Sequence, residues 1–468
     1  MKQFAKKSLV LFIALFFTAA LSAKTPKYIF YCIGDGMSFA HVMATQLFYE
    51  NGNYEDGNES LVFLDFPVRS AIRTYANNSL ITCSAAAGTA LATGHKTNLA
   101  HIGIGPDKQP LTSVAKQLRD KGYAIGIITS GQLDDATPAA FYAGQMRNDT
   151  YQIGKKGADS QFDFLAGSTL MKPFNRRDPS QPYIYDYYRQ KGYTVCRGPE
   201  GYNSQKNADK ILLVDTDTTL KKWLPYVIER EPGKLGLEFM VQAGIEKLYK
   251  KKNKKGFFMM IEGASIDHAS HPRDIATTIK ETIEFDRSVR LAYEFYKKHP
   301  NETLIVVTAD HETGGLGLGT AKYELFLKSL TNQKQSQDLL SKAITDMRKA
   351  KNNKVTWEEM KALLADKMGF WSVLPLSWEQ EKMLRDEYEE SFVKNHTVFE
   401  ESLYAKTEPM AATARKVMSQ IAMVGWTSGN HTAGYVPVFA VGAGSKLFMG
   451  KMDNTEIPKR IAKAAGYK

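Results

Sequence analysis

The sequence has few cysteines, no excess of glycine or proline, and no long hydrophobic stretch beyond its first residues. Three cysteines among 468 residues cannot build a disulfide scaffold. The 35 glycines and 17 prolines exclude a collagen-like chain and a low-complexity chain. Past the N-terminal segment, no apolar stretch approaches the roughly 18 residues of a transmembrane helix. We therefore expect a globular protein with no membrane span, which agrees with a hydrophobic content of 43% and a charged content of 24%.

Residues 1–23 have the features of a secretory signal peptide. Three lysines give the segment a positive start, and the apolar run from Leu9 to Leu21 is too short for a comfortable membrane span. Small residues, among them Ser22 and Ala23, follow this run and precede a polar stretch. We therefore expect an exported protein, either periplasmic or secreted.

The net charge of +11 is a mild basic bias. The densest group of lysines, residues 250–255, follows an apolar-periodic stretch from Leu235 to Tyr249. Cations at the C-terminus of a helix offset the helix dipole, and no aromatic residue interleaves with these lysines. We interpret the group as the solvated end of a helix and expect no nucleic-acid partner.

Short apolar runs that end in acidic or glycine-rich turns predict an α/β fold. Runs of this kind occupy residues 28–33, 123–128, 211–214, 257–261, 303–307 and 435–441. Continuous apolar runs are typical of parallel strands that are buried on both faces. We expect a three-layer α/β sandwich around a largely parallel sheet. Ligands of such sheets bind at the carboxyl ends of the strands, which is where Asp35, Glu262 and Asp310 lie.

Residues 321–422 predict a helical insertion. Thr356 with Glu359, and Ser377 with Gln380, are capping-box patterns at the starts of two amphipathic helices. We expect this cap-like or crown-like insertion to divide one α/β domain into residues 24–320 and 423–468. It could cover the mouth of a site or build a contact between subunits.

Six segments of the α/β domain carry side chains suited to metal binding and catalysis. They are residues 32–37, 82–97, 134–140, 262–271, 308–315 and 429–434. Their mixed carboxylate and imidazole ligands suit zinc where imidazoles predominate and magnesium where all ligands are oxygens. Asp267 and His271 are four residues apart and so face the same way on a helical turn. Ser84 precedes a run of alanines, which predicts a hydroxyl at a helix N-terminus, where anions are favoured.

In their order, these six segments resemble the alkaline phosphatase family, and the resemblance covers most of the chain outside the insertion. It implies that the α/β domain is catalytic and that Ser84 attacks phosphate monoesters to form a phosphoserine. It also implies two zinc ions and one magnesium ion, and it leaves a homodimer open. The implied ligands are Asp267, His271 and His431 for the first zinc; Asp310 and His311 for the second zinc; Asp35 between the second zinc and magnesium; and Asp135, Thr137 and Glu262 for magnesium, with Asp135 acting through a water.

The chain departs from the family pattern at two positions. The family usually has an aspartate directly before the nucleophile, where this chain has Cys83. The phosphate-binding arginine usually lies 13 residues after the first magnesium carboxylate, whereas Arg147 lies 12 residues after Asp135. We assign Arg147 to this position on the assumption of a one-residue deletion. A thiol is a weak hydrogen-bonding partner, so we predict a loosely tethered Arg147, unless Cys83 is simply a small packed side chain.

Several alternatives stay open at this point. His268 either touches the substrate phosphate or a metal-bound water, or has a structural role. The nearest enzyme alternatives are a phosphodiesterase or a sulfatase of the same superfamily, and the magnesium-type residues favour the monoesterase. A third alternative is an inactive phosphate-binding relative. Because Cys32 lies in a predicted buried strand, we do not expect a disulfide with Cys196.

Overall fold

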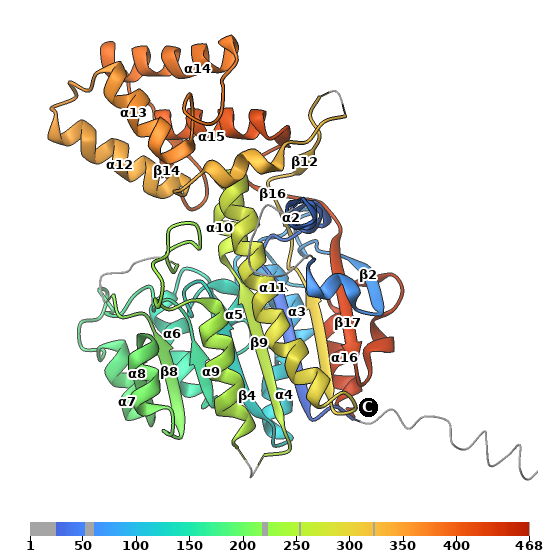
Figure 1. The fold of residues 1–468 in the computed structure, drawn as a ribbon. Coiled ribbons are helices and arrows are strands. Elements are labelled where there is room, and N and C mark those ends of the chain that lie inside the picture. Colours follow the sequence, from blue (N-terminus) through green and yellow to red (C-terminus); the bar gives the residue numbers. More distant parts are fainter. Residues whose placement is uncertain (1–24, 52–59, 218–222, 252–253, 322, 468) are drawn as a thin grey trace, which may run out of the picture.

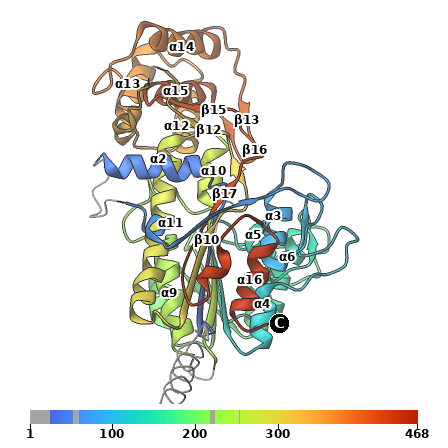
Figure 2. The same cartoon turned by 90° about the vertical axis from the view of Figure 1, so that its right-hand side faces the viewer.

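The computed structural model describes residues 25–51, 60–217, 223–251, 254–321 and 323–467, so the predicted signal peptide lies outside the described residues. Its centre is a sheet of ten strands in the order β18-β2-β17-β10-β1-β9-β4-β6-β8-β7. Figure 2 shows this sheet edge-on, with α9 and α11 on one face and α3, α4, α5 and α16 on the other. The predicted three-layer α/β sandwich is confirmed.

The strands of the sheet run in one direction, except for β17. The predicted strands are all present, and β2, β6, β7 and β18 complete the sheet. In sequence order the strands are β1 (Tyr28–Gly34), β2 (Val68–Arg73), β4 (Ala124–Thr129), β6 (Phe164–Ala166), β7 (Tyr193–Arg197), β8 (Lys210–Val214), β9 (Phe257–Gly263), β10 (Thr303–Thr308), β17 (Val436–Gly442) and β18 (Met452–Asp453). β17 pairs antiparallel with both β10 and β2. The sheet is thus mixed and mostly parallel.

The helices of the α/β domain cover both faces of the sheet (Figure 1). They are α2 (Phe39–Glu50), α3 (Ser84–Thr93), α4 (Val114–Asp120), α5 (Ala136–Ala139), α6 (Thr150–Asp159), α7 (Ile184–Gln190), α8 (Gly198–Gln205), α9 (Leu237–Tyr249), α10 (Ser265–Ser270), α11 (Ile275–Lys298) and α16 (Glu456–Ala464). Apart from the half-buried Tyr28 at the start of β1, the central strands β1, β4, β9 and β10 are buried along their whole length, as their apolar sequences predict. This packing holds the strand ends rigidly at one edge of the sheet.

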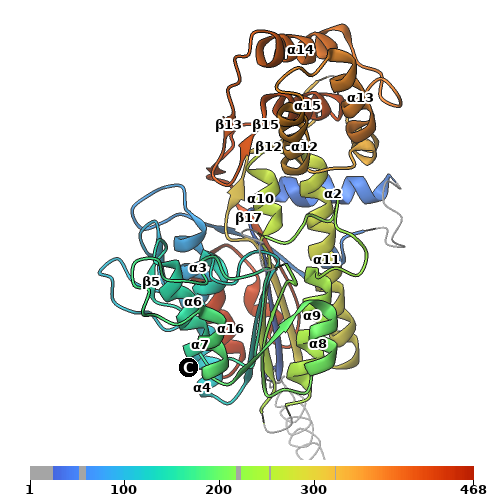
Figure 3. The ribbon, with the colours of Figure 1, turned by 90° about the vertical axis from the view of Figure 1, so that its left-hand side faces the viewer.

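Residues 321–422 form mainly helices that stand beyond the sheet, above α10 (Figures 1 and 3). These helices are α12 (Gln337–Ala350), α13 (Trp357–Met368), α14 (Trp378–Tyr388) and α15 (Pro409–Ile421). Both predicted capping boxes are present, at the starts of α13 and α14. A short hairpin, β13 (Glu400–Glu401) with β14 (Lys406–Thr407), was not predicted. The chain enters and leaves this region side by side, because β12 (Leu316–Leu318) pairs with β15 (Val424–Trp426).

Glu281 is a buried acid on α11. Its Oε1 atom accepts a hydrogen bond of 2.7 Å from the backbone N–H of Val227. Desolvation, together with repulsion from Glu284, raises the pKa of Glu281 to about 8. The folded-state pKa therefore exceeds that of the unfolded chain, which is about 4.3. The stability that this raised pKa contributes is fully present below about pH 4.3 and is lost progressively as the pH rises from there to about 8.

We expect Glu281→Gln to be nearly neutral at pH 4 and to raise the melting temperature at pH 9 by about 2 °C or more. The amide keeps the shape of the neutral acid and does not ionise. Thermal unfolding of both proteins at the two pH values measures the effect. The exposed Glu238 on α9 offers a control, since Glu238→Gln should show no such pH dependence. A Glu281→Gln effect of equal size at pH 4 and pH 9 would contradict the prediction.

Candidate active site

The predicted site residues gather at the carboxyl ends of three neighbouring strands. β1 lies between β9 and β10 and is parallel to both. Asp35 directly follows β1, Glu262 is the penultimate residue of β9, and Asp310 with His311 follow β10. Because parallel strands end at the same edge of a sheet, these side chains converge there, as the sequence predicts.

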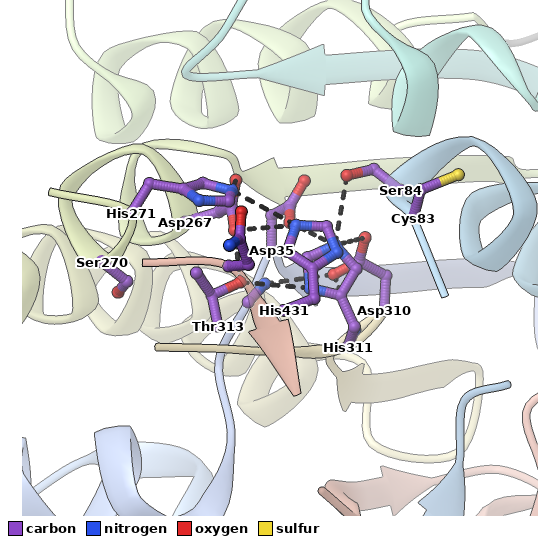
Figure 4. A network of polar contacts seen from close by, with 12 residues as sticks. Asp35, Cys83, Ser84, Asp267, Ser270, His271, Asp310, His311, Thr313 and His431 are labelled. Atoms are coloured by element: carbon purple, nitrogen blue, oxygen red, sulfur yellow. Dashed lines mark hydrogen bonds and ion pairs between the residues drawn. The ribbon is translucent and has the colours of Figure 1, made fainter. Parts of the chain in front are cut away.

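Ser84 is the first residue of α3, and its side chain points into this group of residues (Figure 4). The Ser84 Oγ atom lies 3.1 Å from His311 Nε2 and the residue is 3% exposed. All ten residues of α3 are buried. A Cβ atom on Gly88 would lie 3.0 Å from the Thr137 Cα atom, so the glycine lets α3 approach α5 closely. The alanine-rich, glycine-containing helix therefore holds both Ser84 and Thr137 at the site.

Three histidines and one aspartate form the imidazole-rich part of the site. His271 Nε2 lies 3.3 Å from Asp267 Oδ2, so the two residues face the same way, as their spacing predicts. His431 Nε2 lies 3.2 Å from His271 Nε2. The ring of His311 stacks on that of His431 with centroids 3.6 Å apart.

Backbone hydrogen bonds orient two of these imidazoles for metal binding. His271 Nδ1 lies 2.7 Å from the carbonyl oxygen of Gly429, and His431 Nδ1 lies 2.9 Å from that of Thr82. A carbonyl oxygen only accepts, so each Nδ1 carries the hydrogen and donates it. When both rings are neutral, their Nε2 lone pairs face each other. Two facing lone pairs repel unless a cation lies between them, and a divalent metal ion would remove this repulsion.

The carboxylates of the site are buried and lack hydrogen bonds at several oxygens. Among the described residues, Asp35 Oδ1, Glu262 Oε2, Asp267 Oδ2 and Asp310 Oδ2 have no hydrogen-bond partner. Burial raises the pKa of Asp310 to about 7 and that of Glu262 to about 8. Burial, followed by repulsion from Asp310, raises the pKa of Asp35 well above its usual range. Divalent cations would neutralise this repulsion and bind the free oxygens.

Two sets of ligand atoms are compact enough to hold metal ions. Asp267, His311 and His431 form one set, and Asp35, Asp310 and His311 form the other, with all ligand atoms of a set within 4.8 Å of one another. His311 belongs to both, whereas the sequence interpretation gave it to the second zinc alone. His271 adjoins the first set through Asp267 and His431.

The three predicted magnesium ligands lie differently from one another. Thr137 Oγ1 donates a hydrogen bond of 3.4 Å to Asp35 Oδ2, and Glu262 lies close enough to Asp35 for their ionisation to be linked. Asp135 instead accepts hydrogen bonds from its neighbour Ala136 N–H, at 2.7 Å, and from Arg147 Nη2, at 3.1 Å. The Asp135 carboxylate thus contacts Arg147, whereas Thr137 and Glu262 lie beside Asp35.

The expectation that Arg147 is loosely tethered is wrong. Its Nη2 atom donates hydrogen bonds to Asp135 Oδ1, at 3.1 Å, and to the hydroxyl of Tyr404, at 2.8 Å. Cys83 Sγ accepts the backbone N–H of Ala100, at 3.3 Å. Cys83 is therefore a packed side chain, and Asp135 supplies a carboxylate that Arg147 needs.

Sequence reasoning missed Tyr404 and Trp223 and left His268 open. The His268 ring stacks on that of Trp223, with centroids 4.1 Å apart, and meets the Tyr404 ring edge-on at 4.8 Å. Burial lowers the pKa of His268 to about 4 and keeps the ring neutral. Thr313 was also missed; its hydroxyl donates to Asp267 and lies 3.2 Å from His311 Nδ1. Thr313 lies in the same segment as His311, residues 308–315. That segment was the sequence signal from which Thr313 could have been identified.

A family model described as alkaline phosphatase matches residues 26–163 and 205–467. The chain belongs to the alkaline phosphatase family. Alkaline phosphatase 3 of Bacillus subtilis is 28% identical over 100% of this chain and 98% of its own length. An alkaline phosphatase of Schizosaccharomyces pombe is 30% identical over 92% of this chain and 80% of its own. This alkaline phosphatase family member is therefore a phosphatase, and its substrates are phosphate esters.

Solved alkaline phosphatase structures share the fold. The cold-active alkaline phosphatase of the psychrophile Shewanella sp. superposes with a TM-score of 0.77 at 25% identity, covering 94% of this chain and 100% of that one. The Thermus thermophilus enzyme gives the same TM-score and identity, covering 95% of this chain and 92% of its own. In the part of this family member that the structure describes, no helix is both long and apolar enough to cross a bilayer. Cys32 and Cys196 are free thiols, as expected.

Proposed function

We propose that this phosphatase is a phosphomonoesterase that acts through a phosphoserine intermediate, with two zinc ions and one magnesium ion. The observation that carries the proposal is the position of the buried Ser84 hydroxyl, 3.1 Å from His311 within a mixed set of carboxylates and imidazoles. A serine in that position is a nucleophile beside metal ligands. The proposal extends the coarser phosphatase activity to a substrate class and a covalent intermediate.

The donor set fits these cofactors. His271, His431 and Asp267 would hold one zinc, and His311 with Asp310 the other. Asp35 would join the second zinc to magnesium, beside Thr137 and Glu262, with Asp135 in the outer shell. When bound, two divalent cations about 3.5–4 Å apart stabilise the attacking and departing oxygens of an in-line phosphoryl displacement.

The residues of the chain supply binding, orientation and the nucleophile. Ser84 opens α3, where backbone N–H groups at the helix N-terminus favour an anionic phosphoryl group. Arg147 would bind phosphate oxygens by charge-assisted hydrogen bonds, and Asp135 fixes its direction. The Ser84 oxygen would form the new bond to phosphorus while the ester oxygen departs. Water would then release phosphate from the serine.

The arrangement around Asp35 favours a monoesterase over a phosphodiesterase or a sulfatase. Thr137 and Glu262 both lie beside this carboxylate, and diester- and sulfate-cleaving relatives generally lack the magnesium-type set. Turnover of a simple aryl phosphate monoester and of the corresponding diester, by the purified chain with zinc and magnesium, tests the choice. A preference for the diester would reject the proposal.

We expect elemental analysis to find two zinc ions and one magnesium ion per chain. His431→Ala should lose mainly one zinc, because its Nε2 faces that of His271. Glu262→Gln should lose mainly magnesium. His396 is an exposed histidine in residues 321–422, and His396→Ala should keep the wild-type metal content. A single metal per fully active chain would contradict the assignment.

We also propose that the enzyme is exported to the periplasm or the medium and forms a homodimer. The pattern of residues 1–23 supports export, and the family resemblance supports the dimer. Cell fractionation and light scattering test these two points separately from activity.

A further inference from the structure

Tyr404 reaches the active site from residues 321–422. Tyr404 lies at the tip of the β13–β14 hairpin. The turn is closed by a hydrogen bond of 2.9 Å from the Ser402 N–H to the carbonyl oxygen of Ala405. In Figure 3 this hairpin descends from the helices of residues 321–422 towards α10. Its neighbour Leu403 is 55% exposed. The hairpin thus delivers one side chain inwards and leaves the next one in solvent.

The base of the hairpin is held from two sides. Glu400 forms an ion pair with Arg273, which lies just beyond α10 in the α/β domain. The same carboxylate receives hydrogen bonds of 3.2 Å from Arg415 on α15. On the other strand, Thr407 Oγ1 accepts a hydrogen bond of 2.6 Å from Gln337. These contacts preorganise the hairpin, so the position of Tyr404 is set before any ligand binds.

The Tyr404 side chain makes two kinds of contact at the site. Its hydroxyl accepts a hydrogen bond of 2.8 Å from Arg147 Nη2. Its ring meets the rings of His268 and His271 edge-on, with centroids 4.8 and 5.0 Å apart. The ring fixes the position of the hydroxyl, and the hydroxyl fixes the guanidinium.

Among the described residues, the guanidinium is held at one nitrogen only, Nη2. Nη2 carries two hydrogens, and it donates to two acceptors, Asp135 and Tyr404. The three remaining N–H groups, on Nη1 and Nε, are left for a ligand. Cys83, which occupies the place of the usual acid, accepts from Ala100 instead. The second anchor of Arg147 therefore comes from another part of the fold.

We propose that Tyr404 is a positioning residue that aims Arg147 at the substrate phosphate and links residues 321–422 to phosphate binding. The inference rests on the proposed function, because it assumes that Arg147 binds the phosphate. The Tyr404 hydroxyl supplies Arg147 with an acceptor, whereas the Cys83 thiol accepts from Ala100 instead.

Tyr404→Phe is the direct test, because phenylalanine keeps the ring contacts and removes the acceptor for Arg147. With the zinc- and magnesium-loaded protein, calorimetry should show the affinity for inorganic phosphate falling about threefold to tenfold. The monoester KM should rise by a similar factor, with kcat changing less. Leu403→Ala, on the same turn, is the matched control and should leave both constants unchanged. An unchanged phosphate affinity in Tyr404→Phe overturns the proposal.

A double-mutant cycle separates positioning from packing. In an Arg147→Ala background, Tyr404→Phe should change phosphate affinity less than twofold, because the hydroxyl acts through the missing arginine. An equal loss in both backgrounds would show that the tyrosine acts through packing alone, and the proposal would fall. The cycle measures phosphate binding and does not depend on turnover. A wild-type chain that binds phosphate but hydrolyses no monoester would therefore refute the proposed function, while the cycle would still test the role of Tyr404.

Discussion

Ser84→Ala is expected to lower phosphomonoester turnover by about three orders of magnitude or more. Removing the Oγ atom removes the group that would bond to phosphorus, and no intermediate could form on the chain. Alanine suits the start of the alanine-rich α3, so we expect the fold, the melting temperature and the metal content to match wild type. Initial rates with an aryl phosphate, elemental analysis and thermal unfolding together measure the effect.

Cys83→Ala provides the matched control for this variant. The thiol adjoins Ser84, and its sulfur accepts a hydrogen bond of 3.3 Å from the Ala100 N–H. We expect a change in kcat/KM of less than about threefold, since a sulfur acceptor is weak. Mass spectrometry of wild-type protein quenched in acid should find phosphate on the peptide that contains Ser84. If Ser84→Ala keeps more than a tenth of the wild-type activity, Ser84 is not the nucleophile.

The central sheet could be predicted because its strands are buried on both faces. Such strands are continuous apolar runs, as at residues 28–33 and 303–307, and are visible without any partner. The polar residues that follow them mark the edge where ligands bind. Asp35, Asp310 and His311 therefore could be placed together from the sequence. The one antiparallel strand, β17, gives the same apolar signal as its neighbours, so its direction could not be predicted.

The surroundings of Arg147 could not be predicted, because they depend on tertiary contacts. Tyr404 lies 257 residues further along the chain, on a hairpin whose paired strands have only two residues each. Two residues are too few for a periodic signal. The contact between Asp135 and Arg147 could not be predicted for a related reason: the position of Asp135 before a helix was clear, but its ion pair with Arg147 depends on how the following loop returns to the site.

Removing the metal ions with a chelator is expected to lower activity by about a thousandfold or more, because bound cations supply several kcal/mol of transition-state stabilisation. It should also lower the melting temperature. Asp35, Asp310 and Glu262 are buried at the same strand ends, and without cations their charges repel one another in a poorly solvated site. Adding zinc and then magnesium should restore both properties.

Zinc titrations of two histidine variants make this prediction specific. A ligand that binds only the folded chain raises its stability in proportion to the logarithm of its concentration. Wild type and His396→Ala should therefore melt at rising temperatures as zinc is added. His311→Ala should show a much smaller rise, because His311 is common to both sets of ligand atoms and its loss weakens both. An equal rise in all three proteins would mean that zinc binds elsewhere, and full activity in the chelated wild type would remove the metal ions from the mechanism altogether.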